Sequence, residues 1–322
     1  MDTLFTPVQP ARRHEKYEQL LEMARKCPPL TAAIAHPCDE SSLAGALDAA
    51  RLGLLVPLLV GPAARIAAAA QKARLDISGY EIVDVPHSNA AAERAVALVR
   101  EGRAAALMKG SLHTDELMGA VVDREKGLRT SRRISHCFVM DVPGLEEPLI
   151  ITDAAINIAP TLEAKVDIVQ NAIELAHALG MAEPRVAILS AMETVNPKVP
   201  STIEAAALCK MADRGQITGA LLDGPLAFDN AIDPESARIK GIESKVAGHA
   251  QILVVPDLEA GNMLAKCLSF LAGADAAGIV LGARVPIVLT SRAYSVMTRL
   301  ASCAVAGLVA DYRRGTVGKV MA

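Results

Sequence analysis

Residues 285–299 have the sequence VPIVLTSRAYSVMTR, in which an apolar run is followed at once by polar side chains. Val285 to Leu289 has the composition of a buried strand, and the apolar residues from 300 to 309 predict a helix that begins directly after the polar segment. Thr290, Ser291 and Arg292 then stand where the strand ends and the helix starts. A helix N-terminus has unpaired amides and a partial positive charge, so the segment predicts an anion-binding site. A simple helix cap at Ser291 is the alternative interpretation.

Strand and helix patterns alternate along the rest of the chain. The predicted strands before the midpoint lie at 30–36, 54–60, 81–85 and 104–108, with helices at 14–26, 41–52, 63–74 and 89–101. The later strands lie at 185–190, 219–223, 251–255 and 277–281, with helices at 162–179, 201–214 and 260–272. This alternation predicts an α/β fold on a parallel, doubly wound sheet. Ser201 is the expected cap of the helix that starts there.

A hairpin signal interrupts this alternation. Residues 137–142 and 149–153 are strand-like, and Pro143–Gly144 between them is a turn signal. The length of 322 residues favours two domains, because single cores stop growing near about 250 to 300 residues. The pattern alone therefore predicts a domain boundary near residue 144.

The composition excludes several classes of protein. It is 52% hydrophobic and 21% charged, which is typical of a folded domain and not of a disordered chain. Aromatic residues make up 2%, Trp is absent and the net charge is -3, so neither stacking platforms nor phosphate attraction favours nucleic acid. The sequence predicts no membrane span and no signal peptide. Six cysteines without CxxC spacing favour a reducing compartment, and the predicted location is cytoplasmic.

Ligands of an open parallel sheet collect beyond the carboxyl ends of the strands. The polar side chains that follow predicted strands form the candidate binding set, which is Lys109, Ser111, Asp153, Asn157, Asp223, Glu259, Asn262 and Thr290. A basic run at 124–133 is either a solvated face or an anion-binding loop. The histidines stand singly and no HExxH, Walker, GxGxxG or GxSxG motif is present, so the sequence predicts no metal site and makes Ser291 a binding hydroxyl.

Several longer motifs carry a resemblance to a known family. They are PLIITDAAINIAP at 148–160, METVNPKVPST at 192–202, DGPLAFDN at 223–230, PDLEAGN at 256–262 and LTSRA at 289–293. Together they resemble the phosphate acetyltransferase / phosphate butyryltransferase family over about residues 105 to 306. The chain is also similar to the transferase half of proteins that carry an additional enoyl-CoA hydratase domain.

The resemblance implies a reaction and an architecture. The reaction is acyl-CoA plus inorganic phosphate exchanging with acyl phosphate plus CoA, so that CoA and phosphate are substrates and no cofactor is needed. The implied fold has two α/β domains with a cleft between them, like isocitrate/isopropylmalate dehydrogenases, in a homodimer. The domains would then be 1–144 with 285–322, and 145–284.

The resemblance also assigns roles to residues. Ser291 and Arg292 would hold phosphate and offset the charge that develops on the thioester oxygen, Arg129 would be a second cation, and Asp223 and Asp229 would organise the site. The carboxylate that relatives use as a general base is missing, because Tyr294 and Thr298 stand at the two positions where relatives carry Asp. Tyr294 or a phosphate oxygen is the expected proton shuttle. A catalytically impaired CoA- or acyl-phosphate-binding relative with a regulatory role is the alternative to an active enzyme.

Overall fold

The chain folds around one mixed β-sheet. The computed structural model describes residues 16–289 and 295–316 in full, and only the backbone of Glu15 and of residues 317–320. In these residues eleven strands pair in the order β3-β2-β1-β4-β11-β10-β5-β6-β9-β7-β8. Their bounds are β1 (Leu30–Ala35), β2 (Leu55–Gly61), β3 (Glu81–Asp84), β4 (Ala106–Lys109), β5 (Ser135–Asp141), β6 (Leu149–Thr152), β7 (Arg185–Leu189), β8 (Leu221–Leu226), β9 (Ile252–Val254), β10 (Asp275–Leu281) and β11 (Ile287–Val288).

The sheet has two parallel halves that run in opposite directions. β3, β2, β1, β4 and β11 pair in parallel, and so do β6, β9, β7 and β8. Between the halves, β5 is antiparallel to β6 and β10, and β10 is antiparallel to β11. The predicted hairpin is confirmed, whereas the prediction of a parallel sheet is wrong at the centre. The connections 142–148 and 282–286 are too short for the crossover that parallel neighbours require.

Helices cover both faces of the sheet, as the alternation predicted. Their bounds are α1 (Glu15–Arg25), α2 (Glu40–Arg51), α3 (Ala63–Ala73), α4 (Ser88–Arg100), α5 (Thr114–Val122), α6 (Leu162–Ala178), α7 (Pro200–Asp213), α8 (Phe228–Ile232), α9 (Pro234–Ile239), α10 (Leu258–Leu271) and α11 (Val296–Val320). One face packs against α1, α2, α3, α6, α7 and α11 in a continuous apolar core. On the other face, α4 and α5 cover one core and α8, α9 and α10 a second, separate core.

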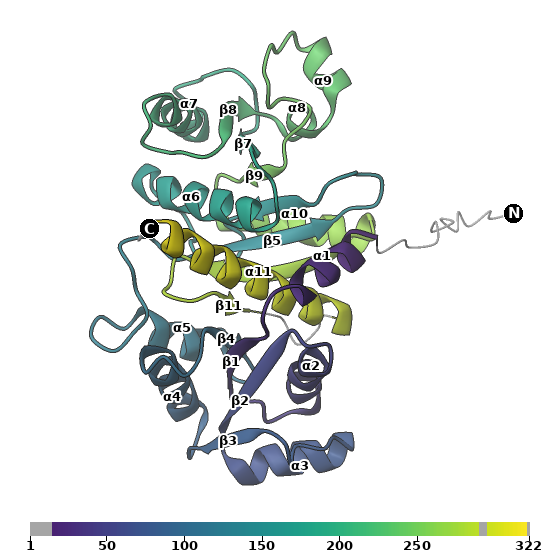
Figure 1. The fold of residues 1–322 in the computed structure, drawn as a ribbon. Coiled ribbons are helices and arrows are strands. Elements are labelled where there is room, and N and C mark those ends of the chain that lie inside the picture. Colours follow the sequence, from purple (N-terminus) through teal and green to yellow (C-terminus); the bar gives the residue numbers. More distant parts are fainter. Residues whose placement is uncertain (1–14, 290–294, 321–322) are drawn as a thin grey trace, which may run out of the picture.

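The last two elements return to the N-terminal half. β11 pairs with β4, and α11 packs against α1 and α2 as well as α6. Figure 1 shows α11 with α1 beside it across the middle of the molecule, between the half that holds β1–β4 and the half that holds β7–β9. The sheet itself continues through both predicted domains. The division into 1–144 with 285–322 and 145–284 stays a prediction.

Most helices start where the sequence predicts, with one instructive exception. Asp39 caps α2 by accepting the amide of Ser42 at 2.7 Å. At α7, however, Pro200 occupies the first turn and the cap position is Val199. Pro suits that position because its fixed φ is already helical and it has no amide to satisfy. The predicted cap Ser201 therefore lies inside the helix, where its hydroxyl bonds to that of Ser190 at 2.8 Å.

None of the helices in the described part of the chain is both long enough and apolar enough to cross a bilayer.

Candidate functional site

The segment that the sequence singles out is flanked by well-defined elements. Thr290, Ser291, Arg292 and Tyr294 lie outside the described residues, and their roles stay predictions. Before them, β11 ends beside β4 and leads into buried Leu289. After them, the Ser295 hydroxyl accepts the amide of Thr298 at 3.1 Å. Because Ser295 caps the helix in this way, α11 begins at Val296 and not directly after Arg292 as predicted.

The carboxyl ends of β1 and β4 form one polar edge beside the carboxyl end of β11. Gly110 and Ser111 donate their amides to the carbonyls of Ala35 and His36 at 2.9 and 2.8 Å. A Cβ at Gly110 would stand 2.5 Å from both carbonyl oxygens, so only glycine permits this approach. The Ser111 hydroxyl also donates to the His36 carbonyl at 2.8 Å. Lys109, the last residue of β4, is buried at this edge.

The imidazole of His36 is held neutral at the same edge. Burial lowers its pKa, and the positive charge of Arg65 lowers it further. Its Nδ1 lies 3.0 Å from the Ser111 hydroxyl and its Nε2 lies 3.5 Å from the Arg65 guanidinium. Lys109 and Arg65 are thus two cations at this edge, which lies beside the carboxyl end of β11.

A second polar cluster follows β6. The buried Asp153 carboxylate accepts the backbone amides of residues 155, 156 and 157 at 3.0, 3.0 and 3.1 Å. It also accepts the Asn157 side-chain amide at 2.6 Å. Asp153 thus folds the loop that follows its strand, because these bonds satisfy a charge that would be costly to bury alone.

Asn157 and α10 connect this loop to its surroundings. The Asn157 carboxamide accepts the Arg133 guanidinium at 2.7 Å and donates to the Ile134 carbonyl at 2.9 Å. Asn262 in α10 donates to the Ala154 carbonyl at 3.2 Å. The structure therefore brings together three predicted residues, Asp153, Asn157 and Asn262, and adds Arg133 to them.

His136 lies between the two polar clusters, on the face where the apolar cores are separate. It is buried on β5, and a Cβ at Gly278 would stand 3.1 Å from its Nε2 and 3.0 Å from the Leu289 carbonyl oxygen. Burial lowers the pKa of His136 to about 4, although the charge of Asp153 opposes this. His136 is thus a neutral imidazole that adjoins both the Asp153 loop and the residue before Thr290.

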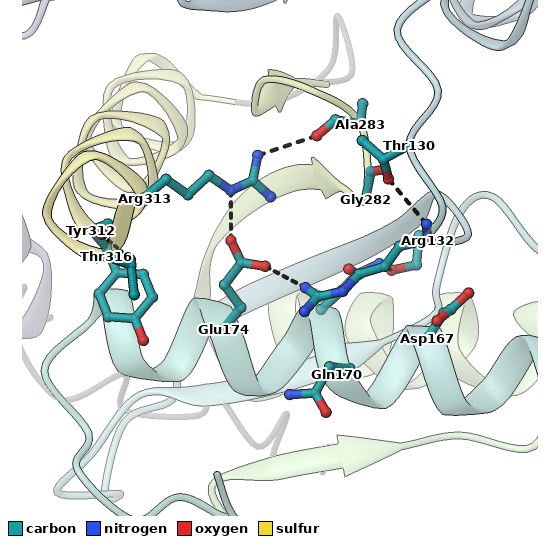
Figure 2. A network of polar contacts seen from close by, with 12 residues as sticks. Thr130, Arg132, Asp167, Gln170, Glu174, Gly282, Ala283, Tyr312, Arg313 and Thr316 are labelled. Atoms are coloured by element: carbon teal, nitrogen blue, oxygen red, sulfur yellow. Dashed lines mark hydrogen bonds and ion pairs between the residues drawn. The ribbon is translucent and has the colours of Figure 1, made fainter. Parts of the chain in front are cut away.

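Arg129 is exposed on the segment 129–133, which is tied to the turn after β10. Arg129 forms a bridge with Ala283, and the Thr130 hydroxyl donates to the Gly282 carbonyl at 2.7 Å. Figure 2 shows that Glu174 of α6 accepts both Arg132 and Arg313, at 2.6 and 2.5 Å. The segment that carries Arg129 is therefore anchored to α6 and α11.

The other predicted residues are Asp223, Asp229 and Glu259. Asp223 is on the edge strand β8, where its carboxylate accepts the next backbone amide at 2.8 Å. Asp229 and Glu259 are exposed in the first turns of α8 and α10. Within residues 16–289 and 295–316, no group of three His, Cys, Asp or Glu side chains could hold a metal ion.

The sequence did not predict three site residues, which are Arg133, His136 and Glu174. Arg133 belongs to the basic run at 124–133, but the run does not reveal which of its cations donates to Asn157. His136 is a polar residue within an otherwise largely apolar strand. That difference in polarity is the only feature of the sequence that could have identified it as a site residue. Glu174 lies on a helix whose pattern predicts only an exposed acid.

The fold places the chain in a class of α/β enzymes whose solved members include phosphotransacylases. A solved structure titled branched-chain phosphotransacylase, from Enterococcus faecalis V583, has a TM-score of 0.77 and 31% identity, and covers 87% of this chain and 99% of its own. A 4-hydroxythreonine-4-phosphate dehydrogenase from Klebsiella pneumoniae shares the fold at a TM-score of 0.52 and 14% identity, with 88% and 99% coverage. The expected dehydrogenase-like α/β fold is confirmed.

Residues 87–307 match the family model described as phosphate acetyl/butaryl transferase, and the chain belongs to this family. A protein named phosphate acetyltransferase, from Rhizobium meliloti, is 70% identical over 308 residues, which are 96% of each chain. The predicted family and the prediction of an acyltransferase are both confirmed.

Proposed function

We propose that this chain catalyses the exchange of acetyl-CoA and inorganic phosphate with acetyl phosphate and CoA. The observation that carries the proposal is the 70% identity to a phosphate acetyltransferase across 96% of both chains. It favours acetyl over butyryl as the transferred group. It also favours an active enzyme over the catalytically impaired relative that the missing carboxylate suggested.

The reaction needs cations near the reacting carbonyl. A phosphate oxygen attacks the thioester carbon, negative charge develops on the carbonyl oxygen, and the C–S bond then breaks to release the CoA thiolate, which takes up a proton. We assign phosphate binding and charge stabilisation to Ser291 and Arg292, with Arg129 as a second cation. Lys109 and Arg65 support this assignment because they add positive charge at the edge that the segment adjoins.

The remaining assignments follow from the contacts of each residue. We assign Asp153, Asn157 and Asn262 to shaping the loop that holds Arg133, and Ser111 to fixing His36. Tyr294 or a phosphate oxygen moves the proton to and from the thiol. CoA, acetyl-CoA, phosphate and acetyl phosphate are the partners of the site.

The test is CoA-dependent conversion of acetyl phosphate, followed by thioester absorbance. We expect turnover by the wild type and a loss of about 100-fold or more in Arg292→Ala, because the guanidinium acts on the developing charge. Arg238→Ala, which removes an exposed arginine paired with Glu235, is the matched control and should keep full activity. If the wild type forms no thioester from any short acyl phosphate, the proposal fails. Undiminished activity in Arg292→Ala would contradict only the assignment of Arg292 to phosphate binding and charge stabilisation. Butyryl phosphate in parallel tests the acyl preference.

We also propose a homodimer located in the cytoplasm. An outer face of α10 supports the dimer, since Met263, Phe270 and Leu271 are 61%, 82% and 85% exposed. Apolar side chains gathered in this way favour a protein interface. The six cysteines are free, which fits a reducing compartment. Light scattering of the purified chain tests the dimer, and cell fractionation tests the location.

A further inference from the structure

A cavity of about 130 Å³ lies beneath α1, on the face of the sheet that α1 and α11 cover. It is bounded by α1, by the first turns of α11, and by the ends of β5 and β10 that face them. Most of the wall is apolar and comes from Leu20, Met23, Val139, Ala277, Met297 and Ala301. A dry apolar cavity of about 150 Å³ accommodates benzene in another protein. The space therefore suits a group of about six heavy atoms and not a whole coenzyme.

Two polar atoms of residues that line the cavity have no hydrogen-bond partner among the described residues. The Tyr17 hydroxyl is buried in a residue only 7% exposed, and it makes no hydrogen bond within this part of the chain. The Asp141 carboxylate accepts Lys16 Nζ at 2.7 Å through Oδ1, while its buried Oδ2 is unpaired. A buried polar group left in this state destabilises the folded protein. A ligand bound in the cavity would satisfy both groups if it supplied their hydrogen-bond partners.

The two atoms specify the chemistry of that ligand. Burial raises the pKa of Tyr17 to about 12, so its hydroxyl is a neutral donor at physiological pH. Asp141 Oδ2 can only accept, so the ligand must also present a donor. Lys16 pairs with Asp141, and a second carboxylate in the wall, that of Asp275, leaves a negative charge that disfavours phosphate or any other anion here. A neutral, mostly apolar group with an N–H beside a C=O meets these requirements, and that group is a secondary amide flanked by methylenes.

One substrate of the proposed reaction contains this group. The pantetheine arm of CoA carries secondary amides separated by methylenes and ends in the thiol. Thr298, in the first turn of α11, lines the cavity and lies six residues after Arg292 in the chain. We propose that the cavity binds an amide of the pantetheine arm, through Tyr17 and Asp141, and so directs the thioester toward the segment that holds phosphate. This inference rests on the proposed acetyltransferase function.

Tyr17→Phe separates this role from a structural one. The substitution removes an unpaired buried hydroxyl, so a residue with only a structural role would leave the unfolding free energy unchanged or higher. For the proposed role, we expect the KM values for CoA and acetyl-CoA to rise about 5- to 30-fold, as for the loss of one or two kcal/mol of binding. The KM values for phosphate and acetyl phosphate should stay within about twofold. Tyr80→Phe, a tyrosine remote from the cavity wall, is the matched control.

Binding of isolated parts of CoA completes the test. Pantetheine should bind the wild type in calorimetry and compete with CoA. Its binding should be lost in Tyr17→Phe and in Leu20→Phe, which fills the cavity. Adenosine 3′,5′-bisphosphate, which lacks the arm, should bind all three proteins equally.

Failure of pantetheine to bind the wild type overturns the cavity assignment whatever the activity. Unchanged KM values for CoA and acetyl-CoA in Tyr17→Phe and Leu20→Phe would also overturn it. A wild type that binds pantetheine in the cavity but forms no thioester would instead overturn the proposed function alone.

Discussion

Arg299 of α11 packs directly over Gly45 of α2. A Cβ at Gly45 would stand 2.9 Å from Arg299 Cδ and 3.0 Å from its Nε, and Arg299 is almost fully buried. Glycine inside a helix costs about 0.8 to 1 kcal/mol relative to alanine. The glycine in α2 is therefore explained by the space that it leaves for a cation in the first turn of α11.

Gly45→Ala should lower activity without stabilising the protein. The gain in helix propensity is offset by displacement of a buried arginine, so we expect little change in the unfolding free energy. Movement of Arg299 and the first turn of α11 should reduce kcat/KM by about 10- to 100-fold.

Gly119→Ala is the control, because Gly119 lies inside α5 with nothing within 4 Å of its Cβ position. It should stabilise the protein by about 0.8 to 1 kcal/mol and keep full activity. Equal behaviour of the two variants in denaturation and activity assays would contradict this account.

Glu174→Gln should loosen the segment 129–133. The carboxylate, whose side chain is 15% exposed, accepts Arg132 from this segment and Arg313 from α11. Because both arginines retain some contact with water, we expect a cost of about 1 to 2 kcal/mol in chemical denaturation. Glu235→Gln breaks an exposed pair with Arg238 on α9 and should leave the unfolding free energy nearly unchanged.

The same variant tests whether the network positions Arg129. The KM for phosphate should rise in Glu174→Gln while the KM for CoA stays constant, because the segment with Arg129 is released, whereas Arg313 of α11 keeps its bond to the Ala283 carbonyl at 3.2 Å. Arg132→Ala should reproduce the KM change. A fall in stability with both KM values unchanged would limit Glu174 to a structural role.

The sequence predicted local structure better than it predicted contacts across the sheet. Alternating patterns located nearly all helices and strands, since apolar periodicity is a local property. They could not reveal that β10 turns back to pair with β5 and β11, because that pairing depends on short connections and distant partners. Of the predicted residues, Asp153, Asn157 and Asn262 meet because Asp153 folds its own loop. The direction of the Arg133 side chain, in contrast, is set by Asn157, 24 residues away.

Acid should destabilise the protein through His136. Its pKa is lowered to about 4 in the folded state, whereas an unfolded histidine titrates near about 6.5. The unfolded chain therefore binds the proton first, and stability falls as the pH drops from about 6.5 toward 4. By pH 5 the expected loss from this group is about 2 kcal/mol.

Denaturation at pH 7.5 and pH 5 measures this effect. His136→Gln should lose about 2 kcal/mol less than the wild type between these two pH values, whatever its stability at pH 7.5. His249→Gln, which replaces an exposed histidine, should follow the wild type at both. Parallel pH profiles for the wild type and His136→Gln would show that His136 does not titrate as proposed.

Cys267 provides a reporter for the proposed dimer. It lies on α10 with Met263, Phe270 and Leu271, and its side chain is exposed in the single chain. Burial raises the pKa of Cys137 and of Cys303 to about 12, so these two thiols should not react in the native protein. If α10 forms the dimer interface, Cys267 is covered there as well.

Phe270→Glu should then give monomers in light scattering and raise the rate of maleimide labelling at Cys267 by at least about tenfold. Val56→Glu, at an apolar residue 50% exposed on β2, should leave both the mass and the labelling rate unchanged. Rapid labelling of Cys267 in a wild-type protein that has the mass of a dimer would exclude α10 as the interface.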